Sequence, residues 1–114
     1  MTEAEMREIV LSFPGAEEGT SYGAPAFKVN GKFFTRLRRD DRSVVITGVS
    51  FDEREMLMEA EPGTFHITAH YKDYPSVLAR IATLHPGSFR NFLERRWRKL
   101  APKKAVKAWD AGRA

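Results

Sequence analysis

The sequence predicts an α+β fold in which helices pack on one face of a mostly antiparallel sheet. Three observations predict this class. The periodic segments follow the order helix, strands, helix, strands, helix. Short turn signals separate the first strands, so they should pair as an antiparallel meander. The chain has 114 residues, of which 42% are hydrophobic, which is enough for one core. We expect one domain over residues 1–102, followed by a basic helix or tail over residues 103–114.

The first helix is predicted close to the start of the sequence. Thr2 and Glu5 have the spacing of a capping box. A stripe of apolar side chains at helical spacing follows, made of Met6, Ile9, Val10 and Phe13. Pro14 and Gly15 end this helix. Residues 17–23 are then either a connector or a short edge strand.

Residues 24–38 predict a β-hairpin around an Asn-Gly turn at Asn30. The turn is either a two-residue connection or a three-residue loop with a bulge, and the choice decides which face each side chain takes. Only the bulged loop separates apolar from charged side chains. In that register one face carries Phe27, Val29, Phe33, Thr35 and Leu37, and the other carries Lys28, Phe34, Arg36 and Arg38. We therefore expect the bulged loop and a basic outer face with one aromatic residue.

A third strand and a second helix are predicted next. The β-branched run SVVITGV follows a turn near Asp40 and reads as a strand. Asp52 is the expected N-cap of the helix, because Glu55 three residues later would complete a capping box. The side chains expected to be buried are Met56 or Leu57, and Ala60. A Pro-Gly pair ends the helix.

The second half of the chain predicts two more strands and the longest helix. A short strand surrounds Phe65, and SVLARIATL is assigned as a strand because it is short and bounded by prolines, although its period also fits a helix. Pro86 opens the long helix, whose stripe contains Phe89, Phe92, Leu93, Arg96, Trp97 and Leu100. Trp97 is expected in the core. Trp109 either docks on the body of the protein or lies exposed beside lysines.

Several functional classes are excluded by what the sequence lacks. The absence of Cys excludes disulfides, Cys-based zinc sites and a Cys nucleophile. No stretch resembles a signal peptide or a membrane span, so we expect a soluble, cytoplasmic protein. His66 and His70 fall on a predicted strand and loop, where their spacing does not indicate a metal site. Phosphate-loop and nucleophile motifs are missing. We expect no catalytic residue, no metal, no cofactor and no enzyme activity.

Positive charge is distributed unevenly along the chain. The formal net charge is +4, the first helix is acidic, and the C-terminal part is rich in Arg and Lys. Cations interleaved with aromatics can neutralise phosphates and stack on bases, although charged outer faces also serve to keep a sheet soluble. The leading hypothesis is a monomer that contacts DNA non-specifically. The expected contacts are Lys28, Arg36, Arg38, Arg39, Arg95, Arg98, Lys99, Lys103 and Lys104.

The alternative hypothesis is a small-ligand or protein-interaction module built from aromatic loops. The expected pocket residues are Tyr22, His70, Tyr71, Lys72 and Tyr74. Structural explanations compete with this one: Tyr22 would pack on the sheet edge, and His70 would bond a backbone group or Asp73. A deep aromatic pocket with converging polar groups favours a ligand, whereas a broad convex basic face favours nucleic acid. An enzyme with an unrecognised site is the remaining alternative.

Three segments, taken in order, resemble the MmcQ/YjbR-like family of small bacterial proteins. They are TSYGAPAFKVNGKFFTRL, FDEREMLMEAEPGTFHITAHYKDYPSVLARIATL and RRWRKLAP. The resemblance implies a compact α+β fold similar to that of CyaY, the bacterial frataxin, and it carries a DNA-binding label. Ser76 stands where relatives often have Trp, so any surface shaped by that Trp is altered here. Iron binding does not carry over, because the carboxylates of the first helix are few and the overall balance is basic.

Overall fold

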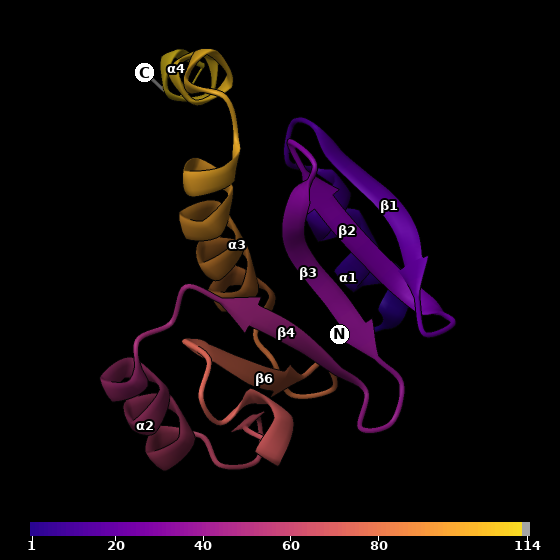
Figure 1. Ribbon diagram of the computed structural model, residues 1–114, viewed down its shortest axis with the longest axis vertical. Coiled ribbons are helices and arrows are strands. Elements are labelled where there is room, and N and C mark those ends of the chain that lie inside the picture. The colour runs from indigo at the N-terminus through magenta and orange to yellow at the C-terminus, as the bar shows by residue number, and fades with distance from the viewer. Residues whose placement is uncertain (113–114) are drawn as a thin grey trace.

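The computed structural model describes residues 1–112, which form a six-stranded antiparallel sheet in the order β1-β2-β3-β4-β6-β5 (Figure 1). The strands are β1 Ala16–Ser21, β2 Ala24–Val29, β3 Lys32–Arg38, β4 Ser43–Thr47, β5 Phe65–His66 and β6 Ser76–Arg80. The helices are α1 Glu3–Leu11, α2 Phe51–Ala60, α3 Pro86–Leu100 and α4 Lys103–Ala111, with a short 3₁₀ turn, η1, at Ala69–Tyr71. The predicted α+β class is confirmed. Residues 113 and 114 of the predicted C-terminal segment lie outside the described residues.

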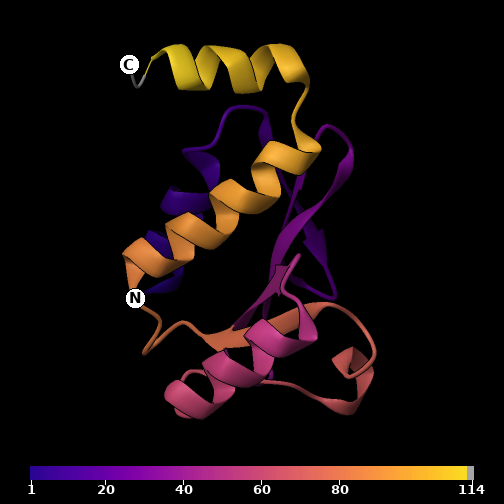
Figure 2. The same cartoon turned by 90° about the vertical axis from the view of Figure 1, so that its left-hand side faces the viewer.

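Helices α1, α2 and α3 pack against the sheet, and α3 crosses in front of the strands when the molecule is turned (Figure 2). Alternation along β4 shows how the two faces differ. Val44 and Ile46 join the hydrophobic core beneath the helices, whereas Val45 between them points to the other face. The segment that contains η1 lies over that other face. The sheet is therefore covered by helices on one side and by a single loop on part of the other.

Several predicted elements are confirmed. Thr2 caps α1, and the Thr2–Glu5 capping box is complete in both directions. The segment at residues 17–23 contains most of an edge strand, β1. The ambiguous segment SVLARIATL begins as β6, which pairs with β4 along its whole length. None of the described helices has the length and apolarity that a membrane crossing needs.

The β2–β3 hairpin turn differs from the prediction. Asn30 and Gly31 form a two-residue turn with positive φ angles of 54° and 74°, and Val29 pairs with Lys32. The expected three-residue loop is therefore wrong. Asn and Gly tolerate the left-handed backbone that this tight turn requires, so the turn keeps its preferred geometry and no bulge forms there.

The bulge instead lies inside β3, and it exchanges the faces of two phenylalanines. Phe34 has no partner on β2, is 1% exposed and enters the core. Phe33, which was expected in the core, is half-buried on the outer face together with Arg36. Beyond the bulge, Phe27 pairs with Thr35 as predicted. The bulge inside β3 thus gives the expected separation of apolar from charged side chains, except that Phe34 faces the core and Phe33 faces outward.

Helix α2 begins earlier than predicted. Ser50, not Asp52, is the N-cap, and its hydroxyl accepts a hydrogen bond from the backbone N–H of Glu53 at 3.1 Å. The start two residues earlier goes with a different buried face. Met56 is 65% exposed and Ala60 is exposed, and only Leu57 of the expected residues packs against the core. The buried residue of this helix is Arg54.

Helices α3 and α4 meet the N-terminal segment through a cluster of aromatic rings. Trp97 is fully buried, as predicted, and its indole N–H donates to the backbone oxygen of Pro14 at 2.9 Å. Trp109 of α4 stacks on Phe13, with ring centroids 5.5 Å apart, and also contacts Trp97. Of the two outcomes predicted for Trp109, docking on the body is the one observed. Helix α4 therefore lies at the far end of the molecule from α2, as both views show (Figures 1 and 2).

Candidate functional site

A cavity of about 440 Å³ opens where strands β3 and β4 part. These strands pair only at Leu37 with Val44 and at Arg38 with Ser43. Beyond this point no further ladder pair joins the two strands, and the Thr35 hydroxyl donates to the backbone oxygen of Val45 at 2.8 Å. The cavity is lined by residues of β3, β4, β6 and α3 and of the segment that contains η1. The bulge that sequence patterning misplaced puts Phe33 on this face, so it supplies part of the cavity wall.

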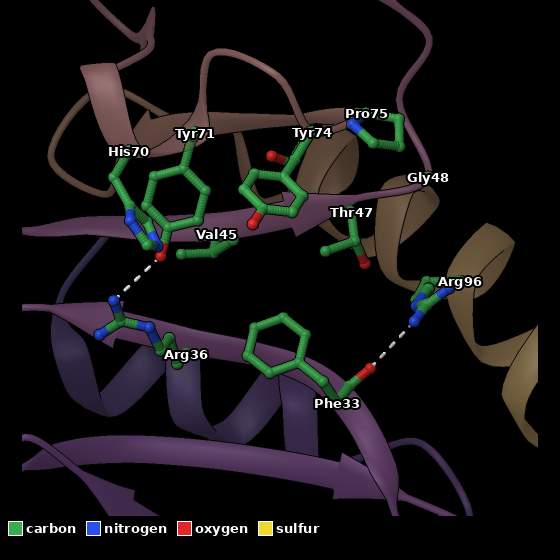
Figure 3. Close-up of a pocket in the computed structure, with 11 residues that line it drawn as sticks. Phe33, Arg36, Val45, Thr47, Gly48, His70, Tyr71, Tyr74, Pro75 and Arg96 are labelled. Carbon is green, nitrogen blue, oxygen red and sulfur yellow. Dashed lines mark hydrogen bonds between the residues drawn. The ribbon is translucent and has the colours of Figure 1, made fainter.

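The walls of this cavity are largely aromatic, and polar groups converge on it (Figure 3). Phe33 of β3 forms one wall, and the rings of Tyr71, in η1, and Tyr74, in the loop after it, face Phe33. The apolar wall is completed by Val45 and Pro75. The polar groups are Arg36, Thr47, His70, Ser76 and Arg96. In the close-up, Phe33 lies between the two guanidinium groups, with Arg36 at one end and Arg96 at the other.

The side chain of Arg54 binds the backbone of residues 71–76, the segment called here the tyrosine loop. Its guanidinium donates to four backbone oxygens of this loop, and its side chain lies over the ring of Phe51 at 4.8 Å. The four accepting residues and the donor–acceptor distances are Tyr71 (3.3 Å), Lys72 (2.9 Å), Tyr74 (3.0 Å) and Ser76 (3.3 Å). Arg54 is only 8% exposed, so these bonds form in a sheltered environment. One buried cation thereby fixes the backbone that carries Tyr71 and Tyr74.

Arg36 and Tyr71 connect the cavity to a chain of polar contacts. Arg36 donates to the Tyr71 hydroxyl at 2.9 Å, and the Arg38 guanidinium lies over the Tyr71 ring at 5.7 Å. Asp41 pairs with Arg38 at 3.1 Å and with His66 at 2.9 Å. Partial burial of the Asp41 carboxylate opposes ionisation, yet hydrogen bonds from His66 and Ser43 and the charge of Arg38 hold its pKa below the usual value. Asp41 therefore stays ionised at neutral pH and anchors this side of the site.

A second hollow of about 360 Å³ adjoins the first and shares Arg36, His70 and Tyr71 with it. Tyr22 stands at its rim, 93% exposed, with a positive φ of 52°. Its ring lies 5.5 Å from the Arg36 guanidinium. A bulky residue in this backbone region is strained, and such strain concentrates at functional sites. The expected packing of Tyr22 on the sheet edge is not observed.

The structure brings most of the predicted pocket residues together. His70, Tyr71 and Tyr74 line the first cavity, and Tyr22 joins His70 and Tyr71 around the second hollow. Lys72 lines neither. His70 packs against the rings of Tyr71 and Tyr74, so these rings rather than Asp73 surround it. Sequence reasoning missed the residues of this site that come from other segments, namely Phe33, Thr47, Arg54, Ser76 and Arg96. The departure noted at Ser76 falls in the cavity wall.

Many of the cations expected to contact DNA are neutralised by carboxylates. Arg38 pairs with Asp41, and Arg39 pairs with Glu3 at 3.1 Å. Arg95 holds both oxygens of Glu53 at 2.8 Å, which lowers the pKa of Glu53 and raises that of Arg95. Arg98 bonds Asp110 and Glu94, and these bonds raise its pKa. The remaining cations of the expected set that make no ion pair with a described residue are Lys28, Arg36, Lys99, Lys103 and Lys104.

The fold defines a small α+β protein. Its cavity between β3 and β4, called the groove below, is lined by arginine and tyrosine side chains among others. The family model described as YjbR matches residues 11–99, so this chain belongs to the YjbR family. Relatives from Mycobacterium bovis and from two strains of Mycobacterium tuberculosis, all described as uncharacterised proteins, are 30% identical over 90 residues. The alignments cover 76% of this chain and 70% of each relative. A comparison with the solved structures gave no significant match.

Proposed function

We propose that this protein is a non-enzymatic binding module for a small, flat, negatively charged molecule, which occupies the cavity between β3 and β4. One observation carries the proposal. Arg36 and Arg96 both line the cavity without a carboxylate partner, and no Asp or Glu lies among the residues that line it. Elsewhere in the described chain, five arginines are engaged by carboxylates. Two guanidinium groups without a carboxylate partner therefore lie where aromatic walls can enclose a ligand.

The size and lining of the cavity suit a small molecule better than a polymer backbone. Ligand pockets commonly enclose roughly 300–1,000 Å³ and combine apolar walls with a few placed polar groups. Phe33 and Tyr74 offer flat faces, and stacking on such faces tolerates many kinds of ring. Guanidinium groups bind carboxylates and phosphates through fixed forks of N–H donors. We therefore expect recognition of a ring and an acid group together, with neither sufficient alone.

Binding without catalysis is the simpler use of this arrangement. Thr47 and Ser76 carry the aliphatic hydroxyls of the cavity, and neither oxygen is bonded to a described base. A nucleophile needs such a base within hydrogen-bond reach. His66 and Asp41 form the one His–carboxylate pair among the described residues. Asp41 also pairs with Arg38, and neither His66 nor Asp41 lines the cavity. These features support a binding protein rather than an enzyme, and we propose separately that it acts as a cytoplasmic monomer.

Non-specific DNA binding is a second candidate, and the exposed lysines favour it. Lys28, Lys99, Lys103 and Lys104 are exposed and make no ion pair with a described residue. Phosphate contacts by such side chains are weak and depend strongly on salt. The ion pairs of Arg38, Arg39, Arg95 and Arg98 leave this candidate with fewer contacts than the sequence predicted. The groove is therefore the better supported site.

Amide chemical-shift mapping tests the proposed function directly. Aromatic anions and matched neutral compounds are titrated into the isotope-labelled protein. We expect anions to shift amides near Phe33, Arg36 and residues 70–76, with about 10-fold weaker binding after Arg36→Gln, because a charge-assisted bond is lost. Arg90→Gln is the matched control, since Arg90 lies outside the groove and is not paired with a carboxylate. Equal binding of neutral and anionic rings, or shifts confined to α4, would contradict the proposal.

A further inference from the structure

The Arg96 end of the cavity differs chemically from the Arg36 end. We propose that Arg96, Thr47 and Ser76 form a carboxylate subsite, and that the ligand is an aromatic monocarboxylic acid with its ring beside Phe33. This inference rests on the proposed function and names its ligand class. Arg36 already donates to the Tyr71 hydroxyl. The Arg96 end instead gathers polar atoms that the folded chain leaves without partners.

Three such atoms lie among the residues that line this cavity. Thr47 Oγ1, Ser76 Oγ and Arg96 Nε are shielded from solvent and have no hydrogen-bond partner among the described residues. Ser76 as a whole is only 1% exposed. A buried polar group without a partner costs free energy, and native proteins contain few of them. Three in one cavity wall indicate a place where an acceptor from outside the chain completes the bonding.

Strand pairing explains why the two hydroxyls act together. Thr47 on β4 and Ser76 on β6 are directly opposite partners in the antiparallel ladder. Side chains of such partners project from the same face, about 5 Å apart at their Cβ atoms. Arg96 reaches the same end of the cavity from α3, where the one hydrogen bond of its side chain to a described residue is a long one, 3.4 Å, to the backbone oxygen of Phe33 (Figure 3). Two hydroxyl donors and one guanidinium therefore converge from three elements.

Charge balance favours a carboxylate over a phosphate at this end. One guanidinium neutralises one carboxylate, and its N–H fork matches the two carboxylate oxygens. A phosphate dianion in the same sheltered place would keep an uncompensated charge, which is costly to bury. Thr47 and Ser76 then donate to the outer lone pairs of the acid. Tyr74 is 57% exposed at the mouth, and we expect rotation of its side chain to open the path by which the acid group reaches these donors.

The test combines three probes with variants that separate binding from folding. The probes are naphthoate, naphthyl phosphate and naphthalenemethanol, measured by calorimetry and by amide shifts. Thr47→Val and Ser76→Ala each remove an unpartnered hydroxyl while keeping a side chain that fits a buried strand. We expect both variants to melt at a higher temperature than the parent and yet to bind naphthoate more weakly. A residue with a merely structural role would not move these two readouts in opposite directions.

Arg96 variants test the charge itself. We expect Arg96→Gln to weaken naphthoate binding roughly 10-fold to 100-fold, which is the loss of one charge-assisted bond. Arg96→Lys should recover part of the affinity, and Arg36→Gln should weaken naphthoate binding less than Arg96→Gln does. The carboxylate subsite would be overturned if Arg96→Gln left the affinity for naphthoate unchanged, or if naphthyl phosphate bound more tightly than naphthoate and did so through Arg36. Either result would leave the proposed function standing. Failure of every anionic probe to reach the groove would overturn both.

Discussion

A single buried arginine controls the geometry of the groove at the scale of residues. Arg54 sits in α2, far in sequence from the loop that it organises, and its guanidinium binds four successive regions of that loop's backbone. The carbonyl oxygens of a loop that crosses a sheet need partners, since the sheet cannot supply them. Arg54 supplies several at once because its donors are arranged in a rigid fork. The positions of Tyr71 and Tyr74 therefore depend on a residue that touches no ligand.

Replacement of Arg54 should loosen this loop while leaving the main core intact. We expect Arg54→Met to lower the free energy of unfolding by about 2–4 kcal/mol, because a buried set of charge-assisted bonds is lost. Urea denaturation measures this change, and hydrogen exchange of the amides in residues 69–76 reports on the loop itself. Arg54→Lys keeps the charge without the fork and should recover only part of the loss. Unchanged protection of these amides in Arg54→Met would show that the loop keeps its conformation without the hydrogen bonds from Arg54.

Sequence patterning could not identify Arg54, and the reason is physical. An Arg in a helix of mixed composition normally points to solvent, and α2 has little amphipathic signal. Tyr71 and Tyr74 were recognisable from the sequence because aromatic residues lie among polar ones in one short predicted loop. Their partners were not, since Thr47, Ser76 and Arg96 meet only after three separate elements have packed.

At the scale of elements, the joint between β3 and β4 decides both fold and site. Hydrophobic alternation correctly predicted the strands and the inward positions of Phe27, Val29 and Leu37. It could not locate the bulge, because a bulge in the turn and a bulge inside β3 give nearly the same inward set. The internal bulge turns Phe33 to the outer face, and the Thr35 hydroxyl bridges β3 to β4 beyond their last ladder pair. A one-residue irregularity therefore supplies an aromatic wall of the groove.

Replacement by Val should have opposite effects on stability at Thr35 of β3 and at Thr47 of β4. Thr35→Val removes a buried hydroxyl that bonds the Val45 backbone oxygen, so we expect the free energy of unfolding to fall by about 1–2 kcal/mol. Thr47→Val removes a shielded hydroxyl that has no partner, so stability should rise. Chemical denaturation of both variants checks the pair. A loss of stability in both would show that the Thr47 hydroxyl has a partner that the folded chain provides.

At the scale of the whole molecule, the arrangement of charge separates the two functional hypotheses. The chain carries 19 Lys and Arg against 15 Asp and Glu, so its excess positive charge is small. The ion pairs of Arg38, Arg39, Arg95 and Arg98 place carboxylates beside several outer cations. Positive charge that is not paired with a carboxylate then remains on guanidiniums inside the groove and on surface cations such as the lysines and Arg90. Only the surface cations can follow a phosphate backbone.

A salt titration with duplex DNA therefore gives a specific expectation. If the protein binds DNA, each phosphate contact contributes about −0.9 to the slope of log K against log salt. Lys103→Ala with Lys104→Ala should reduce that slope, because both lysines are exposed in the first turn of α4. Arg98→Ala should leave it nearly unchanged, because Arg98 already bonds Asp110 and Glu94. A slope that falls with Arg98→Ala would mean that DNA breaks these ion pairs on binding, and the surface, rather than the groove, would then be the principal binding site.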